Sequence, residues 1–173
     1  VLTHTYAGLS GAERLAIHAS NVTIDATSRI DVSGRGYLGG YQSGNSSMYG
    51  RTQGNTTSGG SYYNTGGSHG GVGGTSAWSS SVAAGYDDPL NPQLPGGGGG
   101  SDGNPAGNGG GVVHLLASTL QLDGSIKANG NGATYGAGAG GSIMVNVGTL
   151  SGSGTINARG GNSSNSNEHG GAG

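Results

Sequence analysis

Residues 109–132 read GGGVVHLLASTLQLDGSIKANGNG, and this stretch decides the fold. At an offset of 30 residues the pattern returns as AGGSIMVNVGTLSGSGTINARGG, from Ala139 to Gly161. Leu120 then falls on Leu150, and Ile126 falls on Ile156. Repetition at a fixed period indicates stacked structural units, each of which buries its apolar face against its neighbours.

A third copy lies near the start of the chain, over residues 13–36, and reads ERLAIHASNVTIDATSRIDVSGRG. In this copy Leu15 and Ile17 take the places of Val113 and Leu115. A two-residue insertion then brings Ile30 onto the position of Ile126. All three copies end in a pair of glycines or in G-x-G, followed by a run rich in Gly, Ser and Asn.

Within each copy the apolar residues alternate with polar ones, which is typical of half-buried strands. The second copy predicts three short strands over 113–117, 120–122 and 125–128, with corners at Ser118-Thr119 and Asp123-Gly124. Such copies, stacked on one another, predict an all-β chain that forms a right-handed parallel β-helix (β-solenoid) of about three coils. Its interior would be filled by the aliphatic ladders Leu15/Val113/Ile143, Ile17/Leu115/Val145, Val22/Leu120/Leu150 and Ile30/Ile126/Ile156.

The copies divide the chain into parts of a single β-solenoid segment, 1–173. Coil 1 covers 13–36, a Gly/Ser/Tyr-rich insertion covers 37–108, coil 2 covers 109–138, and 139–173 holds coil 3 and the lead-in to a further coil. A flat antiparallel sheet would not explain why whole copies recur, and the regular offset argues against a disordered linker.

The insertion 37–108 has two interpretations, a flexible coil and packed polyglycine-II-like strands with three residues per turn. Small residues fall at every third place in 97–109, at Gly97, Gly100, Gly103, Ala106 and Gly109. The aromatic residues of the insertion supply packing partners. This favours an ordered flap that lies on the flank of the solenoid.

The amino-acid composition excludes several classes of function. Glycine accounts for 43 of 173 residues, the formal net charge is −2, and the basic residues are scattered, so we expect no nucleic-acid partner. The absence of Cys excludes a disulfide framework and thiolate chemistry. No segment has the roughly 18 apolar residues of a membrane span. Strand edges left open at both ends of the copies predict head-to-tail stacking of the chain with other copies of itself, and hence filaments.

Several phrases resemble a family of large secreted, glycine-rich parallel β-helix repeat proteins, found as surface or adhesin-like proteins of microbes and protists. These phrases are GGSHGGVGG (66–74), GYDDPLNPQLPGGGGGS (85–101) and the copies over 109–132 and 139–161. The resemblance implies an extracellular or cell-surface protein made of many such units. It supplies no catalytic residues, and we expect no cofactor.

Four N-x-[ST] sequons mark possible N-glycosylation sites in an exported protein. Asn45, Asn55 and Asn162 fall in predicted loops and are better candidates than Asn21, which falls at the start of a strand. Chance alone yields several sequons in a chain this rich in Asn, Ser and Thr.

The sequence contains only weak signals for a catalytic or metal-binding site. Asp87-Asp88 is the one acidic pair, but Asp87-Asp88-Pro89 is more typical of a turn than of a two-carboxylate active site. Asp102 lacks the recurring G-G-x-G-x-D pattern of calcium-binding rolls. The five histidines (4, 18, 69, 114 and 169) show no ligand spacing, and His114 is expected to be exposed between Ala16 and Met144. Ser, His and Asp are present, but without a nucleophile-elbow motif.

Taken together, these patterns predict a structural extracellular protein rather than an enzyme, namely a subunit or segment of a glycine-rich fibre or matrix. The alternative is an adhesin module that binds glycans through the aromatic residues of the insertion, since Tyr beside Gly, Ser and Asn is a common recognition composition. A polysaccharide-degrading enzyme is the third hypothesis. The candidate contact surface comprises Tyr37, Tyr41, Tyr49, Tyr62, Tyr63, Trp78 and Tyr86.

Overall fold

A computed structural model describes residues 1–7, 13–165 and 170–172. Six strands alternate between long and short. They are β1 (Leu15–Ile24), β2 (Arg29–Asp31), β3 (Val112–Leu122), β4 (Ser125–Lys127), β5 (Ser142–Ser151) and β6 (Thr155–Asn157). One short 3₁₀ helix, η1 (Gln53–Asn55), is present as well. The described part of the chain is therefore all-β.

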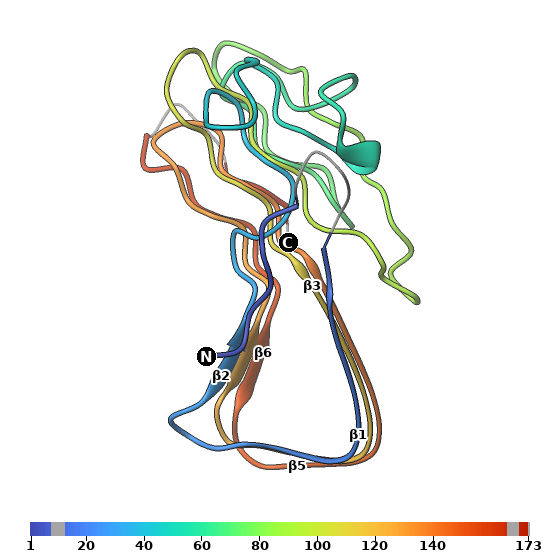
Figure 1. The fold of residues 1–173 in the computed structure, drawn as a ribbon. Helices are drawn as coiled ribbons and strands as arrows, with labels where there is room; N and C mark the ends of the chain where they lie inside the picture. Colours follow the sequence, from blue (N-terminus) through green and yellow to red (C-terminus); the bar gives the residue numbers. More distant parts are fainter. Residues whose placement is uncertain (8–12, 166–169, 173) are drawn as a thin grey trace.

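The strands form two three-stranded parallel sheets, one in the order β1-β3-β5 and the other in the order β2-β4-β6 (Figure 1). Val113 pairs with Ile143 and Ile126 pairs with Ile156, which confirms the offset of 30. Pairing of Leu15 with Val113 and of Ile30 with Ile126 confirms the two-residue insertion in the first copy. All four predicted aliphatic ladders are thus in register across both sheets.

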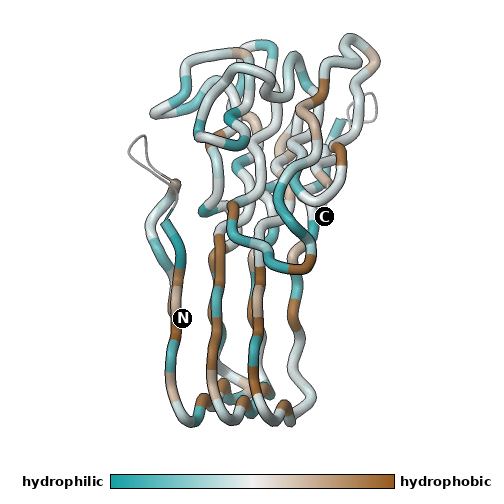
Figure 2. The backbone as a smooth tube through the Cα atoms, turned by 90° about the vertical axis from the view of Figure 1, so that its right-hand side faces the viewer, coloured by the Kyte–Doolittle hydropathy of each residue, from teal (hydrophilic) through white to brown (hydrophobic). Residues whose placement is uncertain are grey.

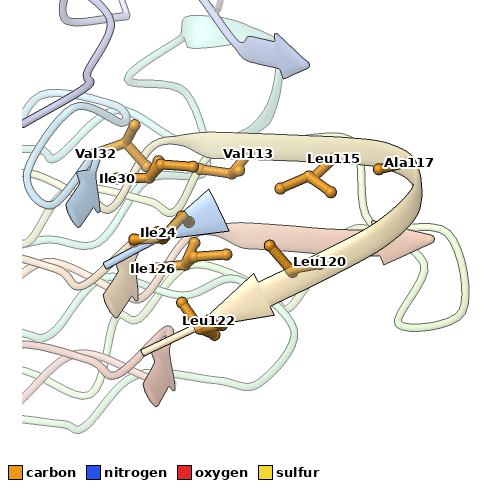
Figure 3. Close-up of a cluster of buried hydrophobic side chains, with 10 residues drawn as sticks. Ile24, Ile30, Val32, Val113, Leu115, Ala117, Leu120, Leu122 and Ile126 are labelled. Carbon is orange, nitrogen blue, oxygen red and sulfur yellow. The ribbon is translucent and has the colours of Figure 1, made fainter. Parts of the chain in front are cut away.

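One predicted break is absent. The stretches 113–117 and 120–122 were expected as separate strands, but both belong to β3, which bends between Ala117 and Leu120 (Figure 3). Pairing with the neighbouring strands continues through the bend, because Thr119 pairs with Asn21 on one side and with Thr149 on the other. The second corner, at Asp123-Gly124, does separate β3 from β4.

The apolar core lies between the two sheets, where the side chains of both point toward one another (Figure 3). The second copy is the best buried, and its Val113, Leu115, Leu120 and Ile126 are almost fully covered. In the first copy Ile24 and Ile30 are also buried, whereas covering falls off in the third copy, which has a neighbouring copy on one side only. In the third copy Leu150 is 56% exposed and Ile156 is 44% exposed.

The outer faces agree only partly with expectation. Asp31, Lys127 and Asn157 pair in one row, as predicted. His114 does pair with Ala16 and Met144, but the prediction that it is exposed is wrong, because only 7% of it is accessible. Its Nε2 lies 2.9 Å from the carbonyl oxygen of Pro92, so segment 85–95 covers this part of β3.

The glycine-rich segments gather beyond one end of the two sheets (Figures 1 and 2). We call this part the Gly-rich lobe, and it comprises residues 36–110 with the runs 129–141, 159–165 and 170–172. It includes the predicted insertion 37–108, and most of that segment does not lie on the flank of the sheets. The glycine runs that lead into β3 and β5 begin inside the lobe, where they form backbone hydrogen bonds with the insertion and with each other. Of the predicted lead-in to a further coil, Glu168, His169 and Gly173 lie outside the described residues.

Hydrogen bonding in the Gly-rich lobe has a period of three. In the central segment 96–101 successive amides donate to three different neighbours, and the fourth amide returns to the first neighbour. Gly96 donates to Gly110, and Gly99 donates to Gly107 in the same neighbouring segment. Gly97 and Gly100 donate to a second neighbour, at Ser68 and Thr65 respectively. Gly98 and Ser101 donate to a third, at Arg51 and Met48 respectively, and all six distances are 2.9–3.1 Å. A β-strand, whose period is two, cannot do this, whereas an extended helix with three residues per turn does so naturally.

Close approach of main chains explains many of the glycines of the lobe. A Cβ atom added at Gly109 would overlap the carbonyl oxygen of Gly96, and one at Gly138 would overlap that of Asn108. The predicted triplet series 97–109 is split in two, because Gly103 lies in a turn with a φ of 141° and has no atom near its Cβ position.

Candidate functional surfaces

A buried polar cluster joins three segments that lie far apart in the sequence. Nε2 of His69 lies 3.2 Å from a carboxylate oxygen of Asp87, and Oγ of Ser142 lies 3.1 Å from the same oxygen and 3.4 Å from Nε2. The Ser142 hydroxyl also donates to the carbonyl of Leu94 at 2.6 Å. All three side chains are almost fully covered. We call this group the His69–Asp87–Ser142 cluster.

Asp87 is the centre of the cluster. Its backbone is left-handed, with a φ of 76°, and its carboxylate accepts the amides of Asp88, Gln93 and Leu94 at 2.8–3.1 Å. These bonds close the loop 87–94 on itself, and the bonds from the Ser142 hydroxyl fix the loop to the first residue of β5. The predicted turn is present here, because Asp88 accepts the amides of Leu90 and Asn91.

Electrostatics at the cluster follow from burial and from these bonds. Burial has the largest effect on His69 and lowers its pKa, although Asp87 acts in the opposite direction. Burial tends to raise the pKa of Asp87, but the amides of Leu94, Asp88 and Gln93 and the His69 ring outweigh it and hold that pKa below its usual value. A neutral imidazole therefore lies beside an ionised carboxylate.

This cluster contains Ser, His and Asp, but its geometry is not that of a hydrolytic triad. A triad uses both ring nitrogens, one for the carboxylate and the other for the serine. Here Asp87 and Ser142 both face Nε2 of His69, and the acceptors of the Ser142 hydroxyl are the Leu94 carbonyl and the Asp87 carboxylate. A neutral His69 that donates from Nε2 to Asp87 has no lone pair there to activate Ser142. The arrangement suits anchoring of the loop.

The cluster predicts an acid-sensitive fold. Because the pKa of His69 is lower in the folded chain, the unfolded chain binds more protons below about pH 6.5, and stability falls as the pH drops through that value. The lowered pKa of Asp87 adds a further loss below about pH 4. Denaturant unfolding between pH 7 and pH 5 should show a steeper fall for the native chain than for His69→Gln, by up to about 1.4 kcal/mol per pH unit. Parallel curves for the two proteins would contradict this assignment.

The seven predicted aromatic contact residues fall into separate groups. Tyr37 and Tyr86 pack in the interior, with ring centroids 6.4 Å apart, and Tyr86 also meets the His69 ring edge-on at 5.2 Å. The Tyr86 hydroxyl donates to the Pro95 carbonyl, and burial raises the pKa of Tyr86. These two rings hold segment 85–95 in place, so they are not available as a contact surface.

A second group lies nearer the surface. The rings of Tyr49 and Tyr62 are 4.6 Å apart, and Tyr63 continues the row at 5.6 Å from Tyr62. Tyr49 is exposed, while Tyr62 and Tyr63 are partly covered. Trp78 is 68% exposed, and Tyr41 is partly covered with a left-handed φ of 50°.

The sequons differ in accessibility. Asn45 is 3% exposed, and its Nδ2 donates to the carbonyls of Gly39 and Tyr49, so the nitrogen that would carry a glycan is already bonded. Asn55 is partly covered and ends η1. Asn162 and Asn21 are exposed, and Oδ1 of Asn21 accepts the Thr119 hydroxyl. Burial therefore favours Asn162 and Asn21, which reverses the order expected for Asn45 and Asn21.

An apolar hollow lies at the β1 end of the core. It has a volume of about 390 Å³ and is lined mainly by residues 1–2, 17, 22–24 and 28–30. Leu2 forms a parallel bridge with Ile30, through bonds from Leu2 to Arg29 and from Asp31 to Leu2. Residues 1–3 thus lie along the free edge of β2, while the neighbouring edge of β1 has no strand beside it among the described residues.

Metal and membrane features are limited. Within residues 1–7, 13–165 and 170–172, no three His, Cys, Asp or Glu side chains are grouped so that they could hold a metal ion. The same residues contain no helix with the length and apolar character needed to cross a membrane.

Comparisons with protein-family models, with curated proteins and with solved structures found no match.

Proposed function

We propose that this chain is a structural subunit of an extracellular glycine-rich fibre or matrix. In this proposal the two parallel sheets are the walls of a three-coil, right-handed β-solenoid, the Gly-rich lobe is a polyglycine-II-like bundle, and copies stack head to tail. The in-register aliphatic ladders and the threefold hydrogen bonding support this architecture. The exposed sequons Asn162 and Asn21 are then the sites at which the fibre would carry glycans.

One observation carries the stacking proposal, namely that the apolar ladders run out to both ends of the sheets. At the β5 end Leu150 and Ile156 are about half exposed. At the β1 end Ile17 and Val22 line the apolar hollow. An apolar surface at each end, together with unpaired strand edges, favours association with another chain.

The two ends are complementary in register. A parallel strand offers the same pattern of donors and acceptors at each step, so β5 of one copy can pair with β1 of the next as β3 pairs with β5. Leu150 would then lie against Val22 of the next copy, and Ile156 against Ile30. A contact between two different surfaces repeats without closing, and therefore gives a filament.

Residues 1–3 stand in the way of this contact. They already lie along the edge of β2 that β6 of a neighbouring copy would take. Among the described residues, three backbone bonds hold 1–7 in place, together with a bond from the amide of Val112 to Nε2 of His4. Stacking therefore requires that residues 1–7 move away, so this segment would inhibit assembly.

Sedimentation velocity and negative-stain microscopy test the stacking. Removal of residues 1–7 is expected to lower the concentration at which filaments form, while Leu150→Asp with Ile156→Lys is expected to prevent them. Leu90→Asp is the matched control, because Leu90 is 92% exposed and lies in the loop 87–94, outside all six strands. Discrete monomers for every variant at all concentrations would refute the proposal.

The alternative function is an adhesin module that binds glycans, and the row of Tyr49, Tyr62 and Tyr63 is the observation that favours it. Adjacent aromatic rings present flat apolar faces on which sugar rings can stack. A glycan array should give signals that Tyr62→Ala and Tyr63→Ala reduce and that Tyr86→Phe leaves unchanged. No signal for the native chain would exclude this function.

A further inference from the structure

A polar pocket in the Gly-rich lobe has no part in the proposed assembly. It has a volume of about 500 Å³ and is lined by residues 42–47, Arg51 and Thr57. Two turns build it. Gln42 and Asn45 exchange backbone hydrogen bonds in the first turn, and Thr52 and Thr56 form a bridge across the second, which contains η1.

Arg51 is fixed between the two turns. Its Nη1 donates to the carbonyl of Asn55 at 2.6 Å, and its Nη2 donates to the carbonyl of Gly44 at 3.2 Å. Both acceptor residues have left-handed backbones, with φ of 57° and 88°. A guanidinium has five N–H donors, so these two bonds set its position and leave further donors on Nη1 and Nη2.

Arg51 takes part in no ion pair found in the described part of the chain. Among the described residues that line the pocket there is no Asp or Glu. An arginine at a pocket is usually paired with a carboxylate, which its planar fork fits well. Here carbonyl oxygens hold the guanidinium, and its positive charge remains for a ligand.

The hydroxyl groups of the pocket are also available. Asn45 and Gln42 use their amides inward, toward the carbonyls of Gly39, Tyr49 and Ala106. The side chains of Ser43, Ser46 and Thr57, by contrast, take part in none of the hydrogen bonds among the described residues. Among its described lining residues the pocket thus combines a cation without an ionic partner, three hydroxyls that are not used in internal bonds, and no carboxylate.

We propose that this pocket binds an acidic sugar, with Arg51 on the oxyanion and Ser43, Ser46 and Thr57 on the ring hydroxyls. The oxyanion is a carboxylate, as in a uronic acid, or a sulfate ester, since a guanidinium pairs with both. Hydroxyl groups of Ser and Thr both donate and accept, so they match a ring that carries hydroxyls of its own. The volume lies within the range of small-molecule sites, about 300–1,000 Å³. This proposal holds whether or not copies of the chain stack.

Titration calorimetry and NMR titration of the whole chain test the proposal. The probes are a galacturonic acid trisaccharide, a chondroitin sulfate tetrasaccharide, neutral maltotriose and inorganic sulfate. Binding is expected for the two acidic saccharides, and their affinity should exceed that of maltotriose and of inorganic sulfate by about tenfold or more. Shifted amide signals should map to residues 42–57.

Variants separate binding from support of the turns. Arg51→Gln should weaken binding of the acidic saccharides by about tenfold or more, and Ser43→Ala with Ser46→Ala should weaken it several-fold at an unchanged melting temperature. The second variant keeps the test valid if Arg51→Gln unfolds the turns. Arg159→Gln, at an exposed arginine outside the pocket, is the matched control and should bind as the native chain does.

Three results would overturn the proposal. They are failure of both acidic saccharides to bind at millimolar concentration, equal binding of inorganic sulfate, and affinity that the Ser43→Ala, Ser46→Ala variant leaves unchanged. Filament formation by the same samples is scored separately.

Discussion

Replacing Gly109 by alanine is expected to cost about 3 kcal/mol of folding free energy, because the new methyl group cannot be accommodated. Its Cβ would overlap the carbonyl oxygen of Gly96, which is main chain. Movement of that chain would break the bonds from Gly96 to Gly110 and from Gly109 to Tyr37, at 2.9 and 3.0 Å. The loss should spread across the Gly-rich lobe, since each extended segment there supports several others.

Gly70→Ala is the matched control for this prediction. Gly70 is exposed in the same lobe, and a Cβ atom at this position would have no atom within 4 Å. Denaturant unfolding of the two variants should differ by at least about 2 kcal/mol. Hydrogen exchange should show lost protection of the amides in 96–101 for Gly109→Ala alone. Equal stability of the two variants would mean that the main chains do not approach one another so closely.

The second large effect is expected at Ile126, the middle member of a three-residue ladder. Its side chain is fully buried between Ile30 and Ile156, so Ile126→Ala should leave a cavity and cost about 3–4 kcal/mol. Ile156→Ala, which removes the same atoms from the exposed end of the same ladder, should cost less than half of that in the monomer.

Concentration adds a second test to this pair of variants. Under conditions where copies stack, Ile156 becomes an inner member of a longer ladder, and the cost of Ile156→Ala should approach that of Ile126→Ala. A cost that is equal at all concentrations, or larger for Ile156 in the monomer, would contradict the position of these residues at the middle and the end of the ladder.

The register of the two sheets could be predicted from the sequence, and the reason is physical. Alternating side chains such as Val113, Leu115 and Ala117 lie on one face of a strand, so copies that share this pattern align by it. The ladder Ile30/Ile126/Ile156 could be predicted in this way even though the first copy contains a two-residue insertion. The sequence did not show that β3 continues through its corner at Ser118-Thr119. A bend within a strand and a break between two strands both contain polar residues, so the two cannot be told apart from the sequence.

The Gly-rich lobe was harder to predict, since glycine has no side chain and therefore shows no face. The spacing of Gly97 and Gly100 did indicate the period of three, but it did not show which segments lie beside 96–101. The His69–Asp87–Ser142 cluster was missed for a related reason. Its members come from separate segments, and the sequence signal at Asp87 was that of a turn, which the structure also contains.

His114 shows the limit of periodicity as a guide to exposure. Its position on the face opposite Val113 and Leu115 was predicted from the pattern. Its burial depends on Pro92 in a distant loop. Asn45 is similar, because a sequon in a polar loop suggests an accessible side chain, while the bonds of its amide to Gly39 and Tyr49 place it in the interior.

The threefold hydrogen bonding of segment 96–101 has a thermodynamic consequence. Melting of the Gly-rich lobe hydrates peptide groups more than hydrocarbon, and hydration of polar surface lowers the heat capacity whereas hydration of apolar surface raises it. The lobe should therefore unfold with an unusually small heat capacity increment, and its stability should change little on cooling. The ladder core, which depends on the hydrophobic effect, should weaken in the cold before the glycine segments do.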